Sequence, residues 1–297
     1  MTKKRNALAV VALLSVSSVW GGAFVLMKDA INLQPFSDFL ATRFLIAAVV
    51  MVLVRPSVFK NFNKQILGRG VILGLLLASG YYTQTVGLEL TTAAISGFIT
   101  GLYVVVTPIL GWVFLKRKTS PKIVLGIALA TIGLAFISIN ASDVFSINVS
   151  TIWLIACAVL FAAHIVGLSV WSPGQDPYAL TVVQLFVVGF STLILAMGNG
   201  YQAPPNAFVW FAVLFTAIFS TAIAFLVQTW AQGIMDASRV AIFLTTEVIF
   251  TALISVSVGQ ESLELKTILG GLLMLAAMLW VEWPTKNNEV FKDSALH

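Results

Sequence analysis

The stretch Leu125-Gly126-Ile127-Ala128-Leu129 returns 144 residues later as Leu269-Gly270-Gly271-Leu272-Leu273. The same shift places Gln84-Thr85 on Gln228-Thr229, and the register runs without a gap from about Gln84 until it reaches Trp280 in the second copy. A few apolar matches arise by chance, but a register of this length indicates a duplicated unit. We therefore predict two repeats, over residues 7–139 and 150–283.

The composition places these repeats in a membrane. Of the 297 residues, 59% are hydrophobic and 10% are charged, and the mean hydropathy is +0.98. A soluble domain carries roughly 25% charged residues, so this chain lacks the charge to cover a surface that faces water. This excludes a soluble enzyme, a nucleic-acid-binding protein and a secreted disulfide scaffold. Cys157 has no second cysteine with which to form an internal disulfide.

Apolar runs bounded by charges, proline or polar clusters predict ten membrane-spanning helices, at about 20 residues per span. In the first repeat they are Ala7–Met27, Phe36–Val54, Gly68–Leu88, Ala93–Leu115 and Ile123–Ile139. In the second repeat they are Ser150–Val170, Ala179–Met197, Ala207–Ala231, Ser238–Val258 and Leu265–Trp283. The expected fold is an all-α integral membrane protein with a short tail, residues 284–297.

Basic residues mark one side of the membrane. They cluster at residues 3–5, 55–69 and 116–122, which fall on the same side of the alternating helices. Among the connections, only Lys28 and Lys266 place a basic residue on the other side. The positive-inside rule therefore predicts both termini, and the tail, in the cytoplasm.

Each repeat has five helices, an odd number, so the second repeat must cross the membrane in the opposite sense to the first. The charges agree with this, because basic Lys116-Arg117-Lys118 is matched 144 residues later by acidic Gln260-Glu261-Ser262. Inverted repeats form bundles with pseudo-two-fold symmetry. Such bundles are the usual basis for alternating access to a site at the middle of the membrane.

Six short stretches follow one another in an order and spacing that resemble the EamA family of the drug/metabolite transporter superfamily. They are Val19-Trp20-Gly21-Gly22-Ala23-Phe24, Arg43-Phe44-Leu45-Ile46-Ala47, Gly97-Phe98-Ile99-Thr100-Gly101-Leu102-Tyr103-Val104-Val105, Phe161-Ala162-Ala163-His164-Ile165-Val166, Val183-Gln184-Leu185 and Leu244-Thr245-Thr246-Glu247-Val248. The resemblance covers about Ala7 to Trp283. Val248 departs from the family, whose second repeat often has a proline after the glutamate.

The resemblance implies a secondary transporter of the bacterial inner membrane that moves small organic solutes, often as an exporter. Family substrates range from amino acids to other metabolites and drugs. The resemblance also implies a cavity lined by the third, fourth, eighth and ninth helices, with the first, second, sixth and seventh helices as gates. We expect alternating access that is proton-coupled or facilitative, so the expected partners are a small-molecule substrate, the lipid bilayer and H+. We expect no cofactor, no metal, no nucleic acid and no enzymatic activity, and a monomer with a dimer left open.

Ionisable side chains are costly inside a membrane and usually face the bundle interior. Glu247, near the middle of the ninth helix, is a candidate for binding a cationic group or a proton, against a purely structural role. Arg43 is a candidate for holding a substrate carboxylate with its planar guanidinium, against snorkelling to the outer interface or an ion pair with Asp38 or Glu89. His164 is a candidate for lining a pocket or for hydrogen bonding there, against a satisfied histidine between helices. A lone histidine lacks the ligand set of a metal site, so we expect no metal at His164.

The 144-residue shift also relates polar and aromatic residues in pairs: Gln84 with Gln228, Trp20 with His164, and Tyr103 with Glu247. We expect these pairs to lie on matching faces around a cavity, with ordinary packing as the alternative. Further aromatic walls are expected among Tyr81, Tyr82 and Trp230. The candidate substrate-binding residues are Glu247, Gln84, Gln228, His164, Tyr103, Trp20, Arg43 and Gln184.

Pro108 is the only proline well inside a predicted span. It removes the backbone hydrogen bond to the Val104 carbonyl, and broken helices line transport sites. We therefore predict a hinge at Pro108, with an inert bend as the alternative.

Two other classes of function remain open at this point. An intramembrane enzyme would need a reactive constellation within the spans, and no third group marks a serine beside His164 as a nucleophile. A channel would let solute equilibrate without saturation, whereas a transporter shows saturable flux and counterflow.

Overall fold

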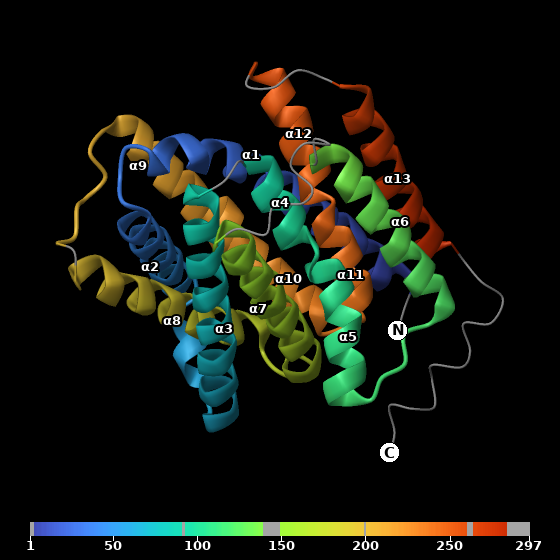
Figure 1. The fold of residues 1–297 in the computed structure, drawn as a ribbon. Coiled ribbons are helices and arrows are strands. Elements are labelled where there is room, and N and C mark those ends of the chain that lie inside the picture. Colours follow the sequence, from blue (N-terminus) through green and yellow to red (C-terminus); the bar gives the residue numbers. More distant parts are fainter. Residues whose placement is uncertain (1–2, 91–92, 139–148, 199, 260–263, 284–297) are drawn as a thin grey trace.

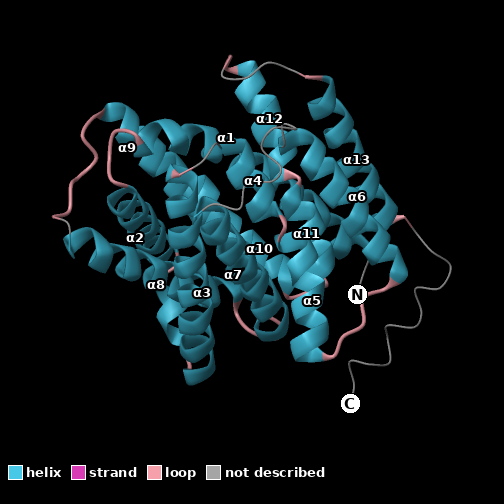
Figure 2. Ribbon diagram, in the orientation of Figure 1, coloured by secondary structure: helices cyan, strands magenta, loops and turns pink. Residues whose placement is uncertain are grey.

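The computed structural model describes residues 3–90, 93–138, 149–198, 200–259 and 264–283. Within these ranges the chain forms helices and no strand (Figure 2). The predicted tail, residues 284–297, and the acidic stretch 260–262 lie outside the described residues.

Helices follow one another throughout the chain (Figure 1). In the first half they are α1 (Lys3–Ile31), α2 (Phe36–Val54), the short η1 (Pro56–Asn61), α3 (Lys64–Glu89), α4 (Ala93–Gly101), α5 (Tyr103–Leu115) and α6 (Pro121–Ser138). In the second half they are α7 (Val149–Trp171), α8 (Pro177–Gly198), α9 (Ala207–Phe215), η2 (Thr216–Ile223), α10 (Ala224–Gln232), α11 (Ala237–Thr245), α12 (Glu247–Ser257) and α13 (Leu265–Glu282).

These elements form the predicted membrane-spanning segments. Seven helical stretches of the described chain are long and apolar enough to cross a membrane, and three shorter apolar stretches are Ile99–Leu115, Pro121–Phe136 and Leu265–Val281. α4 and α5 together make the fourth span, α9, η2 and α10 the eighth, and α11 and α12 the ninth. The all-α membrane fold predicted from the sequence is confirmed.

Helices that the repeat relates pack against each other. α2 lies along α8 at one side of the bundle, and α6 lies along α13 at the opposite side (Figure 1). Between these pairs, α3 packs against α7 and α8, and α1 packs against α10, α11 and α12. Each half of the chain thus contributes one helix to both flanking pairs, as pseudo-two-fold symmetry requires.

Two clusters of buried hydrophobic residues hold the bundle together. The first cluster joins α2 and α8 to the α9–η2 segment, and the second joins α1, α5 and α7 to α11. Trp20 and Phe161 pack against both clusters. The boundary between the clusters therefore passes through the middle of the molecule, where these two side chains lie.

Asparagine and aspartate side chains begin several helices. Asn63 accepts hydrogen bonds of 2.9 Å from two backbone N–H groups at the start of α3. Asp176, Asn206 and Asp236 accept equivalent bonds at the starts of α8, α9 and α11. Such caps satisfy N–H groups that have no partner within the helix. The local sequence therefore fixes where these four helices start.

The fourth and ninth spans are interrupted at equivalent positions. At Leu102 the backbone N–H bonds to the Ile99 carbonyl (3.2 Å), and at Thr246 it bonds to the Phe243 carbonyl (3.1 Å). These are i→i−3 bonds, which locally tighten a helix. Pro108 lies inside α5, beyond the interruption, so the hinge predicted there stays a prediction.

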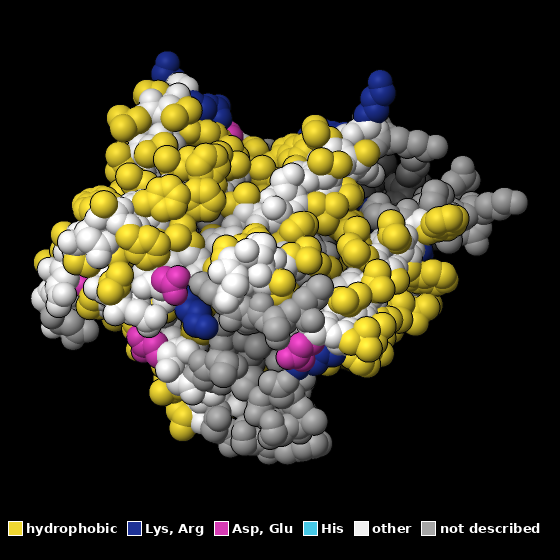
Figure 3. Space-filling view, turned by 90° about the horizontal axis from the view of Figure 1, so that it is seen from above, with side chains coloured by type: hydrophobic (Ala, Val, Ile, Leu, Met, Phe, Trp, Pro, Cys, Tyr) yellow, Lys and Arg dark blue, Asp and Glu magenta, His cyan; other side chains and the backbone are white. Residues whose placement is uncertain are grey.

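The outside of the bundle is apolar. Large hydrophobic side chains are exposed on α2, α5, α8 and α13, among them Leu53, Phe114, Ile194 and Trp280. Hydrophobic side chains cover much of the face seen in Figure 3, and acidic and basic groups are few on it. Such a surface suits lipid rather than water.

Candidate substrate cavity

A cavity of about 80 Å³ lies near the middle of the bundle. By this measure one water molecule needs about 10–15 Å³, so the cavity has room for several waters or part of a small solute. Both halves of the chain contribute to its walls. The lining residues are Trp20, Ala23, Phe24, Met27, Arg43, Leu77, Tyr81, Gln84, Tyr103, Phe161, His164, Ile165, Ser220, Phe225, Gln228, Leu244 and Glu247.

The structure brings most of the candidate residues together. Seven of the eight line this cavity, and the eighth, Gln184, lies behind its wall. Among the further aromatic candidates, Tyr81 lines the cavity, whereas Tyr82 and Trp230 are not among its lining residues. The lining includes all three repeat-related pairs: Trp20 with His164, Gln84 with Gln228, and Tyr103 with Glu247.

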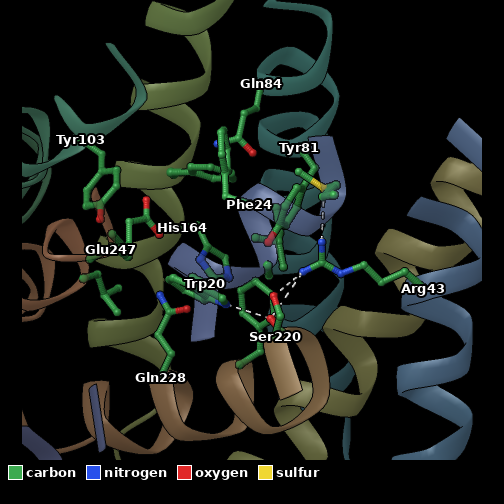
Figure 4. Close-up of a pocket in the computed structure, with 17 residues that line it drawn as sticks. Trp20, Phe24, Arg43, Tyr81, Gln84, Tyr103, His164, Ser220, Gln228 and Glu247 are labelled. Atoms are coloured by element: carbon green, nitrogen blue, oxygen red, sulfur yellow. Dashed lines mark hydrogen bonds between the residues drawn. The ribbon is translucent and has the colours of Figure 1, made fainter. Parts of the chain in front are cut away.

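Glu247 and Tyr103 lie at one end of the cavity (Figure 4). Glu247 is the first residue of α12, and the N-terminus of a helix favours a negative charge. Its carboxyl group makes no hydrogen bond or ion pair with any described residue, and it is partly exposed to the cavity. The Tyr103 hydroxyl is buried and has no hydrogen-bond partner within the described chain. Both groups are available to a ligand.

Close packing of α1 sets the position of Glu247. A Cβ atom added at Gly21 would lie 2.7 Å from the Thr251 backbone nitrogen and 2.9 Å from the Glu247 carbonyl oxygen. Glycine therefore lets α1 approach the backbone of α12 at the residue that carries the carboxyl group. The neighbouring Trp20 side chain then enters the cavity.

Gln228, one of the two repeat-related glutamines, offers a free hydrogen-bond acceptor to the cavity. Gln228 donates through Nε2 to Gln232 Oε1 at 3.0 Å, and Gln232 in turn donates to the Ile165 carbonyl. Gln228 Oε1 is buried without a partner among the described residues. Because buried polar atoms are nearly always hydrogen-bonded, this acceptor is free for a water or a substrate donor. Gln84 lines the cavity from α3.

Arg43 lies at the other end of the cavity (Figure 4). Its Nε donates to Thr221 Oγ1 at 2.6 Å, and its Nη2 donates to Ser220 Oγ at 2.9 Å. The ion pair considered for Arg43 is not found among the described residues. Asp38 instead accepts from Ser37 and from the Gln202 backbone N–H, and Glu89 is exposed.

A π-helical segment of the eighth span presents the partners of Arg43. η2, which contains Ser220 and Thr221, packs against α2 and α1, and π-helical turns occur frequently at functional sites. The Ser220 carbonyl accepts a 2.8 Å hydrogen bond from Trp20 Nε1 as well as a longer one from Arg43. The same turn of η2 therefore binds both the guanidinium of Arg43 and the indole of Trp20 in the cavity wall.

Gln184 positions His164. Gln184 Nε2 donates to the Leu180 carbonyl (3.1 Å), which turns Gln184 Oε1 toward His164 Nε2 at 2.8 Å. The acceptor at Nε2 requires the imidazole to carry a proton there, and a neutral ring then has Nδ1 as its acceptor. Gln184 is thus a positioning residue and not a wall of the cavity.

Sequence reasoning missed Ser220, Thr221 and Met27. The pair Ser220-Thr221 is the polar interruption of an apolar run, and this is the signal by which it could have been found. Among the described residues, no group of three His, Cys, Asp or Glu side chains could hold a metal ion.

The fold and the cavity define a multi-pass membrane protein with a polar site between two repeats. The sequence model of the EamA-like transporter family matches residues 7–139 and 149–283. The chain belongs to this family of membrane transporters.

Relatives that match nine-tenths or more of the chain include two proteins named as transporters. An uncharacterized transporter of Archaeoglobus fulgidus is 32% identical over 268 residues, which cover 90% of this chain and 83% of that protein. The uncharacterized transporter YyaM of Bacillus subtilis is 26% identical over 91% of this chain and 92% of its own length. A WAT1-related protein of Arabidopsis thaliana is 24% identical over 99% of this chain and 94% of its own length.

One crystal structure shares the fold with a TM-score of 0.78 at 15% sequence identity, and the match covers 93% of this chain and 96% of that one. At this identity the likeness concerns the fold alone.

Proposed function

We propose that this transporter exports small organic metabolites, such as amino acids or drug-like solutes, by alternating access of the cavity to the two sides of the membrane. The observation that carries the proposal is the lining of one cavity by three pairs of repeat-related residues. A site on the pseudo-two-fold axis of inverted repeats is reached from either side when one repeat rocks against the other.

The chemistry of the cavity suits a partly apolar solute. Aromatic walls supply contact area, and a few polar groups fix orientation, which is the usual composition of a small-molecule site. Glu247 is proposed to bind an amine group of the substrate, or a proton in a coupled cycle. The protein is proposed to lie in the bacterial inner membrane with both termini in the cytoplasm.

Contacts at the two ends of the bundle support the gating role of the second and seventh spans. Where α2 ends and α8 begins, Arg55 pairs with Asp176 at 3.0 Å. At the opposite end, Gln34 Nε2 donates to the Gln202 carbonyl at 2.7 Å. Gln34 and Asp176 precede matching prolines of the two repeats. In an alternating cycle one of these contacts opens while the other stays closed.

The test compares metabolites inside and outside bacterial cells that produce the wild type, Glu247→Gln or no transporter. Glu89→Gln is the matched control, because Glu89 is exposed at the end of α3 and does not line the cavity. All variants are brought to equal levels in the membrane. We expect the wild type and Glu89→Gln to displace the same compound across the membrane, and Glu247→Gln to displace much less of it.

The outcomes separate the parts of the proposal. If the wild type and Glu247→Gln displace equal amounts of the compound, the proposal of transport stands and the role of Glu247 is structural. No difference between the wild type and empty cells would contradict export. Saturable flux and counterflow in vesicles are expected from a transporter, and flux that rises linearly with concentration would identify a channel.

A further inference from the structure

Arg43 is the only lysine or arginine among the described residues that line the cavity. It is 3% exposed, so its charge is almost completely removed from water. Its hydrogen-bond partners are the neutral oxygens of Ser220 and Thr221, and no described carboxylate lies beside it. A buried charge without a counter-ion is costly, and in a membrane protein such a residue marks a ligand pathway.

The guanidinium is oriented but not saturated. Nε and Nη2 are held by the hydroxyls of η2, whereas Nη1 donates to the thioether sulfur of Met27 at 3.7 Å, and the Tyr81 hydroxyl also interacts with the guanidinium. Sulfur is a weak acceptor, and methionine is the most adaptable of the large apolar side chains. The Nη1 edge is therefore the part of Arg43 that a ligand oxygen would reach by displacing Met27.

Aromatic rings hold the cation without neutralising it. The guanidinium carbon lies 5.3 Å from the centre of the Phe44 ring and 5.7 Å from that of Tyr81. Contacts of this kind stabilise a cation. They leave its net positive charge in place.

We propose that Arg43 is an anion subsite of the transport cavity that binds a single carboxylate of the substrate, with Ser220 and Thr221 as its positioning residues. This deepens the proposed transport function and rests on it. One unit of positive charge matches a monovalent carboxylate better than a phosphate dianion, and the Nη1 edge left by the η2 hydroxyls can donate charge-assisted hydrogen bonds to a carboxylate oxygen.

The part of the ligand next to its carboxylate is apolar. Next to Arg43 the cavity wall is an aromatic cluster, in which the Tyr81 ring lies 5.5 Å from Phe161 and 6.4 Å from Phe225. Trp20 lies 5.6 Å from the same Phe225 ring. The substrate class is therefore a carboxylate attached to an apolar or aromatic body.

Binding of matched acids and amides tests this inference directly. The probes are phenylalanine, leucine and 3-phenylpropanoate, each paired with its primary amide, which has the same shape without the negative charge. Binding is measured on the purified full-length protein from the rise in its melting temperature with ligand concentration. We expect at least one acid to bind about tenfold more tightly than its amide, as expected for the loss of charge-assisted hydrogen bonds.

Three variants assign the preference to Arg43. In Arg43→Gln the acid and amide are expected to bind equally, and in Arg43→Lys a weakened preference for the acid should remain, because the charge is kept but the planar fork is lost. Arg43→Lys also guards against a general failure to fold. Arg117→Gln, which removes an exposed charge outside the cavity, is expected to bind like the wild type.

The inference is overturned if no acid binds better than its amide, or if Arg43→Gln keeps the preference of the wild type. Because binding is measured without flux, this result is independent of the export experiment. If the amides show saturable flux and Arg43→Gln does not change that flux, the protein is a transporter but Arg43 is not an anion subsite.

Discussion

Tyr103 and Glu247 each begin the second half of an interrupted span, at positions 144 residues apart. The hydrogen bonds around them also match, because Thr107 Oγ1 donates to the Tyr103 carbonyl and Thr251 Oγ1 donates to the Glu247 carbonyl. Both side chains enter the same cavity. The two repeats thus share one backbone arrangement at this position, and the side chain that it presents is a phenol in the first repeat and a carboxylic acid in the second.

The packing of α1 on α12 predicts a difference between two neighbouring glycines. Gly21→Ala would place a methyl group against the immovable backbone of α12, and such overpacking typically costs about 1–3 kcal/mol. In Gly22→Ala the new Cβ would meet only the end of the Ile254 side chain, at 3.3 Å. We expect Gly21→Ala to lower both the melting temperature and transport, with Gly22→Ala close to the wild type. Equal effects would contradict the tight contact at Gly21.

Removing the partner of His164 should loosen the cavity from behind. In Gln184→Leu the imidazole N–H loses its buried acceptor, at a cost of about 1–3 kcal/mol. We expect a lower melting temperature and a higher apparent KM for transport. Thr192→Val is the control on the same helix, because the Thr192 hydroxyl bonds only to carbonyls of its own helix. A Gln184→Leu protein with the wild-type KM would show that the ring needs no support.

The hinge proposed at Pro108 predicts a kinetic effect. Pro108→Ala restores the backbone N–H that the Val104 carbonyl lacks, which stiffens α5. We expect a lower maximal transport rate at an unchanged apparent KM, measured by counterflow in vesicles. An unchanged rate would contradict a hinge at Pro108 and make the proline an inert bend.

The contact between α2 and α8 predicts a dependence of stability on pH. Burial alone would raise the pKa of Asp176, but hydrogen bonds from Asn61 and from the Tyr178 backbone N–H, together with the charge of Arg55, hold that pKa below its ordinary value of 3.8. A carboxyl group whose pKa is lowered by folding stabilises the fold fully above the ordinary value. That stabilisation is lost as the pH falls through the lowered value.

Asp176→Asn should therefore be less stable than the wild type at pH 7, by about 0.5–1 kcal/mol for a partly exposed ion pair, and the difference should shrink below pH 3.8. Asparagine keeps the helix cap, so Asp176→Ala is expected to lose roughly a further 1 kcal/mol at every pH. Thermal unfolding in detergent across this range is the measurement. A difference between Asp176→Asn and the wild type that is independent of pH would show that the charge is not involved.

The spans and their inverted arrangement were predictable because a membrane imposes simple rules. Apolar length, loop charge and the odd number of helices per repeat act over many residues, so errors of a few residues do not matter. The interruptions at Leu102 and Thr246 gave no signal, since a change from i→i−4 to i→i−3 bonds needs no special residue. Pro108 drew attention to α5 but lies beyond the break, and α12 begins at Glu247 although Val248 replaces the family's proline.

The cavity was foreseeable to the extent that polar groups are costly in a membrane. Glu247, Arg43 and the paired glutamines were prominent for that reason, and the repeat register selected Trp20 with His164. Ser220 and Thr221 were missed because hydroxyl groups in spans usually bond to their own helix. Here a π-helical turn redirects them to Arg43, and no rule of local sequence predicts such a turn. Gln184 was expected to line the cavity, but it lies behind His164, which lines it.

Accessibility of the cavity from each side tests the central claim of alternating access most directly. A single cysteine replaces Gln84 in a Cys157→Ala background, and a membrane-impermeant thiol reagent is applied to right-side-out and inside-out vesicles, with and without Asp176→Asn. Loosening the contact between α2 and α8 should shift the population toward conformations open at that end. We predict that labelling rises from the side on which α2 ends and falls from the other side. Rates that change in parallel, or that do not change at all, would contradict alternating access.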